Sequence, residues 1–274
     1  MKIILVSETN IASSNIGKIL LDKHPFKKSH ILFMDKPVYK LGDILVVFTE
    51  RNVIDIDELE EPLSHLKPDV IVVASTHKSE QEVSSLTCHS PGNWGPADMG
   101  GKPKQLSIAP ALFLRACLLE LADQKDEKNL DYEVSLEVTH HGPSYSLPIM
   151  FAEVGSSEKQ WKDMEACEAV ADTIFKILTS PLETVPTTVF IGGGHYAPTP
   201  TRRVLSGRIA IGHMCPKYQI EHLDSEMLLQ AIDKTTPRPA FVTIEWKSFV
   251  SAERERLIEL LKENNISWKK DKEI

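Results

Sequence analysis

The sequence contains no long apolar run. None approaches the ~18 residues that a membrane-spanning helix needs, so we expect no contact with a membrane. The first apolar run, residues 3–6, ends at Ser7 and is too short for the core of a signal peptide. It predicts a first strand instead, and the expected location is cytoplasmic.

Cysteine is scarce as well. The four cysteines show no C-x-x-C spacing, which argues against a zinc ribbon and a redox dithiol. The sequence also lacks the H-E-x-x-H pattern of zinc peptidases and the G-x-S-x-G pattern of serine hydrolases. Any hydrolytic chemistry must therefore rest on other residues.

Basic residues do not dominate the chain, whose net charge is −8. This charge argues against a general nucleic-acid coat. Residues 99–119 and 185–220 nevertheless contain no Asp or Glu, so a polyanion can still bind locally. The basic candidates in these two stretches are Lys102, Lys104, Arg202, Arg203 and Lys217.

What is present is an alternation of short apolar runs with helical patterns. It predicts an α/β fold, with a mostly parallel or mixed sheet flanked by helices, in a single domain over residues 1–274. Expected strands lie at residues 2–6, 31–34, 44–48, 69–74, 132–138, 187–191, 209–211 and 240–245. Expected helices lie at about residues 12–21, 108–122, 157–178 and 251–263. Residues 75–105 are predicted to form a long loop, and loops of that length are commonly functional.

Six of the ten histidines follow a predicted strand or lie in a loop near one. Neighbouring strand ends of a parallel sheet converge on one crevice, so these histidines predict a single site. Imidazole titrates near neutral pH and also binds zinc. The six are His77, His89, His140, His141, His195 and His213.

Glu137 precedes the pair His140-His141 by three and four residues. Its carboxylate can orient a histidine, bind a metal or act as a base, and an ion pair is the simpler alternative. Glu153 is a weaker candidate of the same kind. The run Gly192-Gly193-Gly194 lies close to a predicted helix start, where a phosphate or carboxylate can bind, unless the run only makes a tight turn.

These motifs together resemble one family, the D-aminoacyl-tRNA deacylases of the archaeal and plant type. The resemblance is carried above all by Thr139-His140-His141-Gly142-Pro143 and by the run Gly-Gly-Gly-His-Tyr-Ala-Pro at residues 192–198. It also covers residues 37–43, 75–79, 87–95, 151–158, 212–218 and 245–247. The resemblance implies a fold similar to the phosphorylase/hydrolase group that includes peptidyl-tRNA hydrolase. It also implies a zinc requirement and hydrolysis of the ester that joins a D-amino acid to tRNA.

With this activity in view, we expect His89, His140 and His195 to bind the metal, and His141 with Glu137 to activate water. Ligand and base can be exchanged within this set. Backbone donors of Gly192, Gly193 and Gly194, together with His213, are expected to bind substrate. The expected partner is tRNA carrying a D-amino acid, guided by the five basic candidates, and no protein partner is evident.

Two other functions fit the same residues. One is a metal-dependent hydrolase or phosphorylase of a small metabolite, which would not need tRNA. The other is a tRNA-binding module without catalysis, which would not need clustered histidines.

Overall fold

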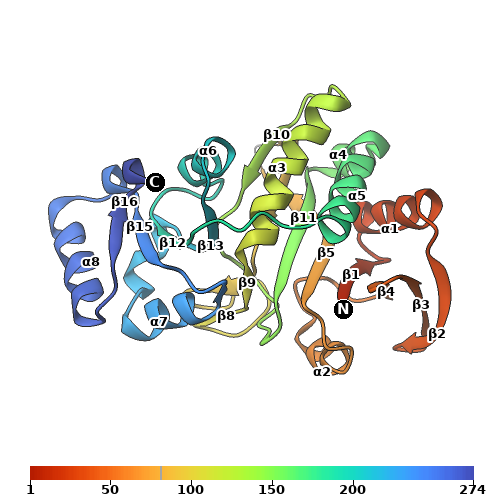
Figure 1. Cartoon of the computed structure of the whole chain (residues 1–274), viewed down its shortest axis with the longest axis horizontal. Coiled ribbons are helices and arrows are strands. Elements are labelled where there is room, and N and C mark those ends of the chain that lie inside the picture. The colour runs from red at the N-terminus through yellow and green to blue at the C-terminus, as the bar shows by residue number, and fades with distance from the viewer. Residues whose placement is uncertain (81) are drawn as a thin grey trace.

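A computed structural model describes residues 1–80 and 82–274 of the chain. Two sheets lie side by side, the larger one formed by the N-terminal part and the smaller one by the C-terminal part (Figure 1). The larger sheet has eight strands in the order β10-β6-β11-β5-β1-β4-β3-β2. These are β1 (Lys2–Ser7), β2 (Lys27–Phe33), β3 (Lys36–Leu41), β4 (Ile44–Thr49), β5 (Val70–Lys78), β6 (Ser85–His89), β10 (Glu133–Leu136) and β11 (Ile149–Ser156).

The larger sheet is mixed. Strands β4, β1, β5 and β11 run parallel to one another, whereas β6 pairs antiparallel to β11. Strand β10 follows the direction of β6 and forms one edge of the sheet. The carboxyl ends of β6 and β10 therefore approach the centre of the sheet from the direction opposite to β5.

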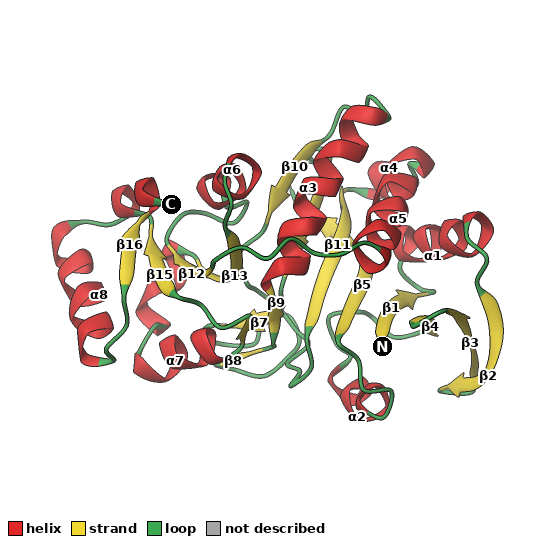
Figure 2. Cartoon of the chain, viewed as in Figure 1, coloured by secondary structure: helices red, strands yellow, loops and turns green. Residues whose placement is uncertain are grey.

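Helices cover one face of the larger sheet (Figure 2). Helices α1 (Ile11–Lys23), α3 (Ala111–Glu127) and α5 (Met164–Thr179) bury Ile16, Leu118 and Val170 against strand residues such as Val72. Part of the other face is covered by residues 53–66 and Tyr145. Those residues include η1 (Asp57–Leu59) and α2 (Glu60–Ser64).

The smaller sheet is all parallel, in the order β13-β12-β15-β16. Its apolar side chains pack on Leu228 of α7 and Leu257 of α8, and the opposite face packs on α3 and α6. Its elements are β12 (Thr187–Ile191), α6 (Pro198–Ser206), β13 (Ala210–Cys215), η2 (Lys217–His222), α7 (Ser225–Asp233), β15 (Phe241–Ile244), η3 (Trp246–Ser248), α8 (Ser251–Glu263), β16 (Trp268–Lys270) and η4 (Asp271–Glu273). Four two-residue strands complete the fold: β7 (Gly92–Asn93), β8 (Gln105–Leu106), β9 (Ala109–Pro110) and β14 (Thr235–Thr236).

The α/β class and the mixed, helix-flanked sheet agree with the sequence, but the predicted loop at 75–105 was wrong in its first half. Strand β5 continues to Lys78, and β6 adds a further buried strand at Ser85–His89. Both segments contain Ser, Thr and His, and these polar residues led to the prediction of a loop. They are strands because each pairs with β11, one on either side. Gln81, which also falls in the predicted loop, lies outside the described residues.

Several other elements also differ from the expected ones. Strands β3 and β11 were not predicted, and the helix expected over residues 157–178 is two helices, α4 (Glu158–Trp161) and α5. The break has a local cause, because the Asp163 side chain caps α5 by accepting from the N–H groups of Glu165 and Ala166. Among the described residues, no helix combines the length and the apolar character needed to cross a membrane.

Candidate active site

Two central strands change from apolar to polar along the same face of the larger sheet. Side chains two residues apart share a face, so Val73, Ser75 and His77 of β5 lie in one row. In the pairing of β11 with β5, Phe151 is opposite Val73 and Glu153 is opposite Ser75. The row thus begins in the hydrophobic core and ends in buried polar groups.

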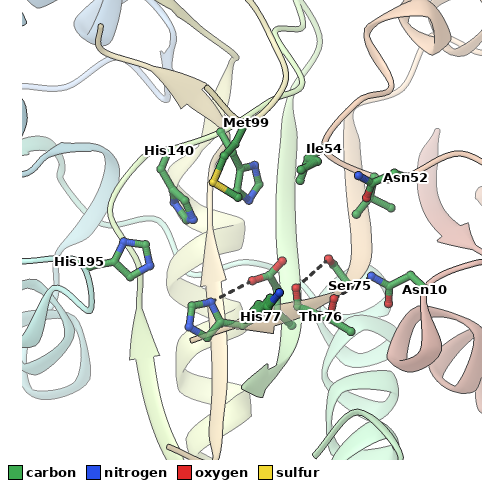
Figure 3. A pocket seen from close by; sticks show the side chains of 13 residues that line it. Asn10, Asn52, Ile54, Ser75, Thr76, His77, Met99, His140 and His195 are labelled. Atoms are coloured by element: carbon green, nitrogen blue, oxygen red, sulfur yellow. Dashed lines mark hydrogen bonds and ion pairs between the residues drawn. The ribbon is translucent and has the colours of Figure 1, made fainter. Parts of the chain in front are cut away.

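A pocket of about 300 Å³ opens above these polar groups. Figure 3 shows His140 and His195 on one side of it and Asn10 and Asn52 on the other, with His77, Ser75 and Thr76 between them. Its lining is completed by Val53, Ile54, Lys78, Met99, His141 and Glu153. Residues from seven separate stretches of the sequence therefore meet in one place.

His89 lies fully buried at the end of β6, beside the pocket. Its ring stacks on Phe151, with centroids 5.1 Å apart, and lies 4.3 Å from the ring of His140 and 4.8 Å from that of His141. Within the described residues neither ring nitrogen of His89 has a hydrogen-bond partner. Burial lowers the pKa of His89 to about 3, so the ring is neutral with a lone pair available.

His140 and His141 are held by backbone carbonyl groups. Nδ1 of His140 donates to the Val138 carbonyl at 2.8 Å, and Nδ1 of His141 donates to the Gly142 carbonyl at 2.6 Å. Each ring therefore keeps the lone pair on Nε2, as metal-binding histidines do. Burial lowers the pKa of His140 well below its usual range and that of His141 to about 4.

These three histidines could hold a metal ion. One nitrogen from each of His89, His140 and His141 lies within 4.8 Å of the others. A second such group is His77, Glu137 and His195, and a third joins His89 to Glu137 and Glu153. The unpartnered nitrogens of His89, which are costly to bury alone, fit a metal ligand.

Glu137 is fully buried just after β10, and its partners differ from the expected one. Nε2 of His195 donates to its Oε2 at 2.9 Å, and Nδ1 of His77 lies 3.1 Å from its Oε1. Nε2 of His140 is 3.6 Å from Oε2. His141, expected to pair with Glu137, bonds to backbone instead. The structure thus groups His195 with Glu137, and His141 with the other two histidines.

The buried carboxyl groups of Glu137 and Glu153 both lie near Nδ1 of His77. Burial raises the pKa of Glu137, but hydrogen bonds from His195 and His77 outweigh it and hold the pKa well below its usual range. Burial and the Glu137 charge together raise the pKa of Glu153 far above its usual range, against a weaker effect of Ser75. Burial thus favours the protonated form of Glu153, whereas the hydrogen bonds favour the ionised form of Glu137.

His77 was given no role from the sequence, yet it is central to the site. Its Nδ1 faces both carboxyl groups, 3.1 Å from Glu137 and 3.9 Å from Glu153, and its Nε2 lies 3.1 Å from the hydroxyl of Tyr196. Gly155 makes room for it, because a Cβ there would lie 2.8 Å from the His77 Cβ. Its place directly after an apolar strand was the available signal.

The first two glycines of the triple-glycine run have their N–H groups occupied. The N–H of Gly192 donates to the Cys215 carbonyl and that of Gly193 donates to Ser248 Oγ. Both have positive φ, and a Cβ on Gly192 would lie 2.8 Å from that of Glu245. These glycines build a tight turn after β12, which carries His195 to the pocket. Gly194 is exposed with open space around it.

His213, expected to bind substrate, does not line the pocket. It is fully buried in β13, with Nδ1 3.1 Å from Thr139 Oγ1 and Nε2 2.8 Å from the Ser107 carbonyl. Burial lowers its pKa to about 4, so the ring is neutral. Since both nitrogens are engaged within the protein, His213 positions the segment before His140 rather than offering a free group.

The five basic candidates divide into two groups. Lys104 forms an ion pair with Asp224 at 2.8 Å, and Lys217 lies 3.7 Å from Glu253. These two lysines lie in sequence stretches without Asp or Glu, but the fold brings an acidic residue from another stretch next to each of them. For Lys102, Arg202 and Arg203, the described part of the chain offers no ion-pair partner within 4.0 Å.

Comparison with known proteins identifies the family of this chain. Residues 64–269 match the family model for D-aminoacyl-tRNA deacylase. A protein of that name from Thermococcus onnurineus is 37% identical over 99% of this chain and 100% of its own length, and one from Methanosarcina acetivorans is 37% identical over 99% and 92%. A crystal structure of a conserved protein of unknown function superposes with a TM-score of 0.92 at 32% identity, covering 100% of this chain and 96% of the other. The chain belongs to the D-aminoacyl-tRNA deacylase family.

Proposed function

We propose that this protein hydrolyses the ester that joins a D-amino acid to the 3′ end of tRNA, releasing the free amino acid and tRNA. Family membership supports this reaction. The observation that carries it for this chain is the set of neutral histidines beside an ionised and a protonated carboxyl group, because ester hydrolysis needs both a base and a proton donor.

We further propose that the metal ion of the site is zinc, held by His89, His140 and His141. Three neutral imidazoles with free ring nitrogens match the ligands that zinc prefers. Bound there, zinc would polarise the ester carbonyl and acidify a water molecule. The group of His77, Glu137 and His195 offers a second set of ligands in the same pocket.

The base is assigned to His195, oriented by Glu137. His195 lines the pocket with a third of its side chain exposed, and its Nε2–H donates to the buried carboxylate at 2.9 Å. This leaves the lone pair on Nδ1 to take a proton from water, as a carboxylate-oriented histidine does in other hydrolases. Glu153, protonated at the pocket floor, is positioned to donate a hydrogen bond.

In this proposal residues 1–274 form one functional unit, because His77 lies in strand β5 of the larger sheet and His195 follows strand β12 of the smaller sheet. The tRNA acceptor end reaches the pocket past Arg202, Arg203 and Lys102, which have no ion-pair partner among residues 1–80 and 82–274. Lys104 and Lys217 contribute less.

Incubation of the purified protein with D-Tyr-tRNA, L-Tyr-tRNA and a D-tyrosyl methyl ester tests the function. We expect rapid release of D-tyrosine from tRNA and much slower hydrolysis of the other two. Equal rates on the free ester and on tRNA would instead support a hydrolase of small metabolites. Binding of tRNA without any hydrolysis would support a non-enzymatic module.

A further inference from the structure

A groove separate from the pocket lies between α6 and the edge strand β10, with a volume of about 420 Å³. Leu136 N–H donates to Thr201 Oγ1 at 3.0 Å and ties the two elements together at its base. Such a volume suits a ligand the size of a nucleoside. The groove is lined by Glu133, Val134, Ser135, Tyr196, Pro198, Thr201, Arg202, Leu205 and Ser206.

The edge of β10 presents one backbone donor and one backbone acceptor to this groove. N–H groups of Glu133 and Glu137 donate toward β6, to the carbonyls of Ser84 and Cys88. Leu136 N–H points the other way, toward α6. Backbone direction alternates along a strand, so the N–H and C=O of Val134 also face α6 and the groove. An edge strand leaves such groups unpaired.

The remaining lining combines apolar surface with one cation. Leu205 of α6 is 40% exposed, and Pro198 and the Tyr196 ring continue this apolar surface. Arg202 is exposed and, in the described residues, has no ion-pair partner, although Glu133 lies in the same lining. A ligand with a flat apolar body, a hydrogen-bonding edge and one phosphate matches this combination.

Tyr196 connects the groove to the pocket. Its side chain lines the groove, while its hydroxyl lies 3.1 Å from Nε2 of His77 in the pocket. The adjacent residue His195, with ring centroids 5.2 Å apart, lines the pocket itself. A molecule that occupied both spaces would pass directly over the candidate base.

We propose that the groove between β10 and α6 binds the terminal adenosine of the tRNA, while the aminoacyl group occupies the pocket. This inference rests on the proposed function. Adenine offers an acceptor, N1, beside a donor, the 6-amino group, and these complement the N–H and C=O of Val134. Leu205, Pro198 and Tyr196 cover the faces of the base, and Arg202 binds the 5′-phosphate of the nucleotide.

The direct test is titration of the whole protein with AMP, GMP and adenosine. We expect AMP to bind at least about tenfold more tightly than GMP, because guanine presents an acceptor and a donor in the opposite order. Leu205→Glu should weaken AMP binding about tenfold or more, since it places a like charge beside the phosphate. Arg202→Ala should weaken AMP but leave adenosine, which has no phosphate, unchanged.

Leu229→Glu is the matched control, because Leu229 is 39% exposed on α7, a nine-residue helix like α6, and does not line the groove. With D-Tyr-tRNA, Leu205→Glu should raise KM about tenfold with little change in kcat, and Leu229→Glu should change neither. Hydrolysis of the D-tyrosyl methyl ester should be the same in both variants.

Three results would overturn the groove assignment: AMP and GMP binding equally, Leu205→Glu binding AMP as the wild type does, or Leu205→Glu losing ester hydrolysis as well. If the wild-type protein does not hydrolyse D-Tyr-tRNA, the proposed function fails, and the AMP titration still decides the groove by itself. The two failures are therefore distinguishable.

Discussion

Glu137 and Glu153 approach the same ring nitrogen of His77, at 3.1 and 3.9 Å, yet the pKa of Glu137 is lowered and that of Glu153 is raised. Two buried carboxylates so close to each other cannot both carry charge, so their pKa values move apart. The hydrogen bonds from His195 and His77 decide that Glu137 keeps the charge. This division suggests different tasks for two residues of the same type.

The two glutamates should respond differently to the same substitution. Glu137→Gln removes the charge that orients His195, so we expect kcat to fall by about a hundredfold or more. Glu153→Gln replaces a protonated acid by a neutral group of similar shape, so kcat should fall by less than about tenfold. Steady-state kinetics on D-Tyr-tRNA compare them, and equal losses would contradict the assigned charges.

Removal of the proposed zinc should abolish activity, because an ion held by His89, His140 and His141 would polarise the ester. We expect a chelator to lower kcat and added zinc to restore it. The melting temperature should also fall, since a ligand that binds only the folded state stabilises it. Full turnover by protein shown to be metal-free by elemental analysis would exclude a catalytic metal.

Substitution of a single proposed ligand tests the zinc site without a chelator. His89→Ala should lower the zinc content of the purified protein severalfold, whereas His65→Ala, at an exposed position, should leave it unchanged. Normal zinc content in the His89 variant would show that the metal is held elsewhere.

His213 should make stability depend on pH. Its pKa is about 4 in the folded protein and about 6.5 when unfolded, so between these values only the unfolded state binds the proton. Stability is therefore unaffected above pH 6.5 and falls as the pH decreases toward 4. His213→Gln should remove up to about 1.4 kcal/mol per pH unit of this slope in urea unfolding. An unchanged slope would show that His213 does not stay neutral.

Affinity for tRNA should depend on the unpaired arginines rather than on Lys104. Changing Arg202 and Arg203 to Ala should weaken binding and flatten its salt dependence by about one unit of log–log slope per lost phosphate contact. Lys104→Ala should have a smaller effect because Asp224 already neutralises that lysine. Filter binding at several salt concentrations compares the two, and a larger effect of Lys104 would reverse the assignment.

The fold class and most of the residues gathered at the site could be predicted from the amino-acid sequence. The apolar runs at β1, β4, β5 and β12 are continuous because these strands are covered on both faces, and that pattern is visible without a structure. The sequence predicted that His89, His140, His141 and His195 would meet, on the expectation that they follow parallel strands. They do meet, although β6 and β10 run antiparallel to β11 and His195 follows a strand of the smaller sheet. The helix at Ser251–Glu263 was predicted from its amphipathic pattern, and the structure confirms it.

The way in which these residues pair could not be predicted from the sequence. Strand β11 was missed, and it brings Phe151 and Glu153 beneath the histidines through antiparallel pairing with β6, which no local pattern encodes. The expected pair of His141 and Glu137 did not form, because His141 has a positive φ and its ring bonds to the Gly142 carbonyl. Lys104 met Asp224 across 120 residues of sequence. Each outcome depends on contacts between distant segments, whereas sequence patterns report mainly on burial and local geometry.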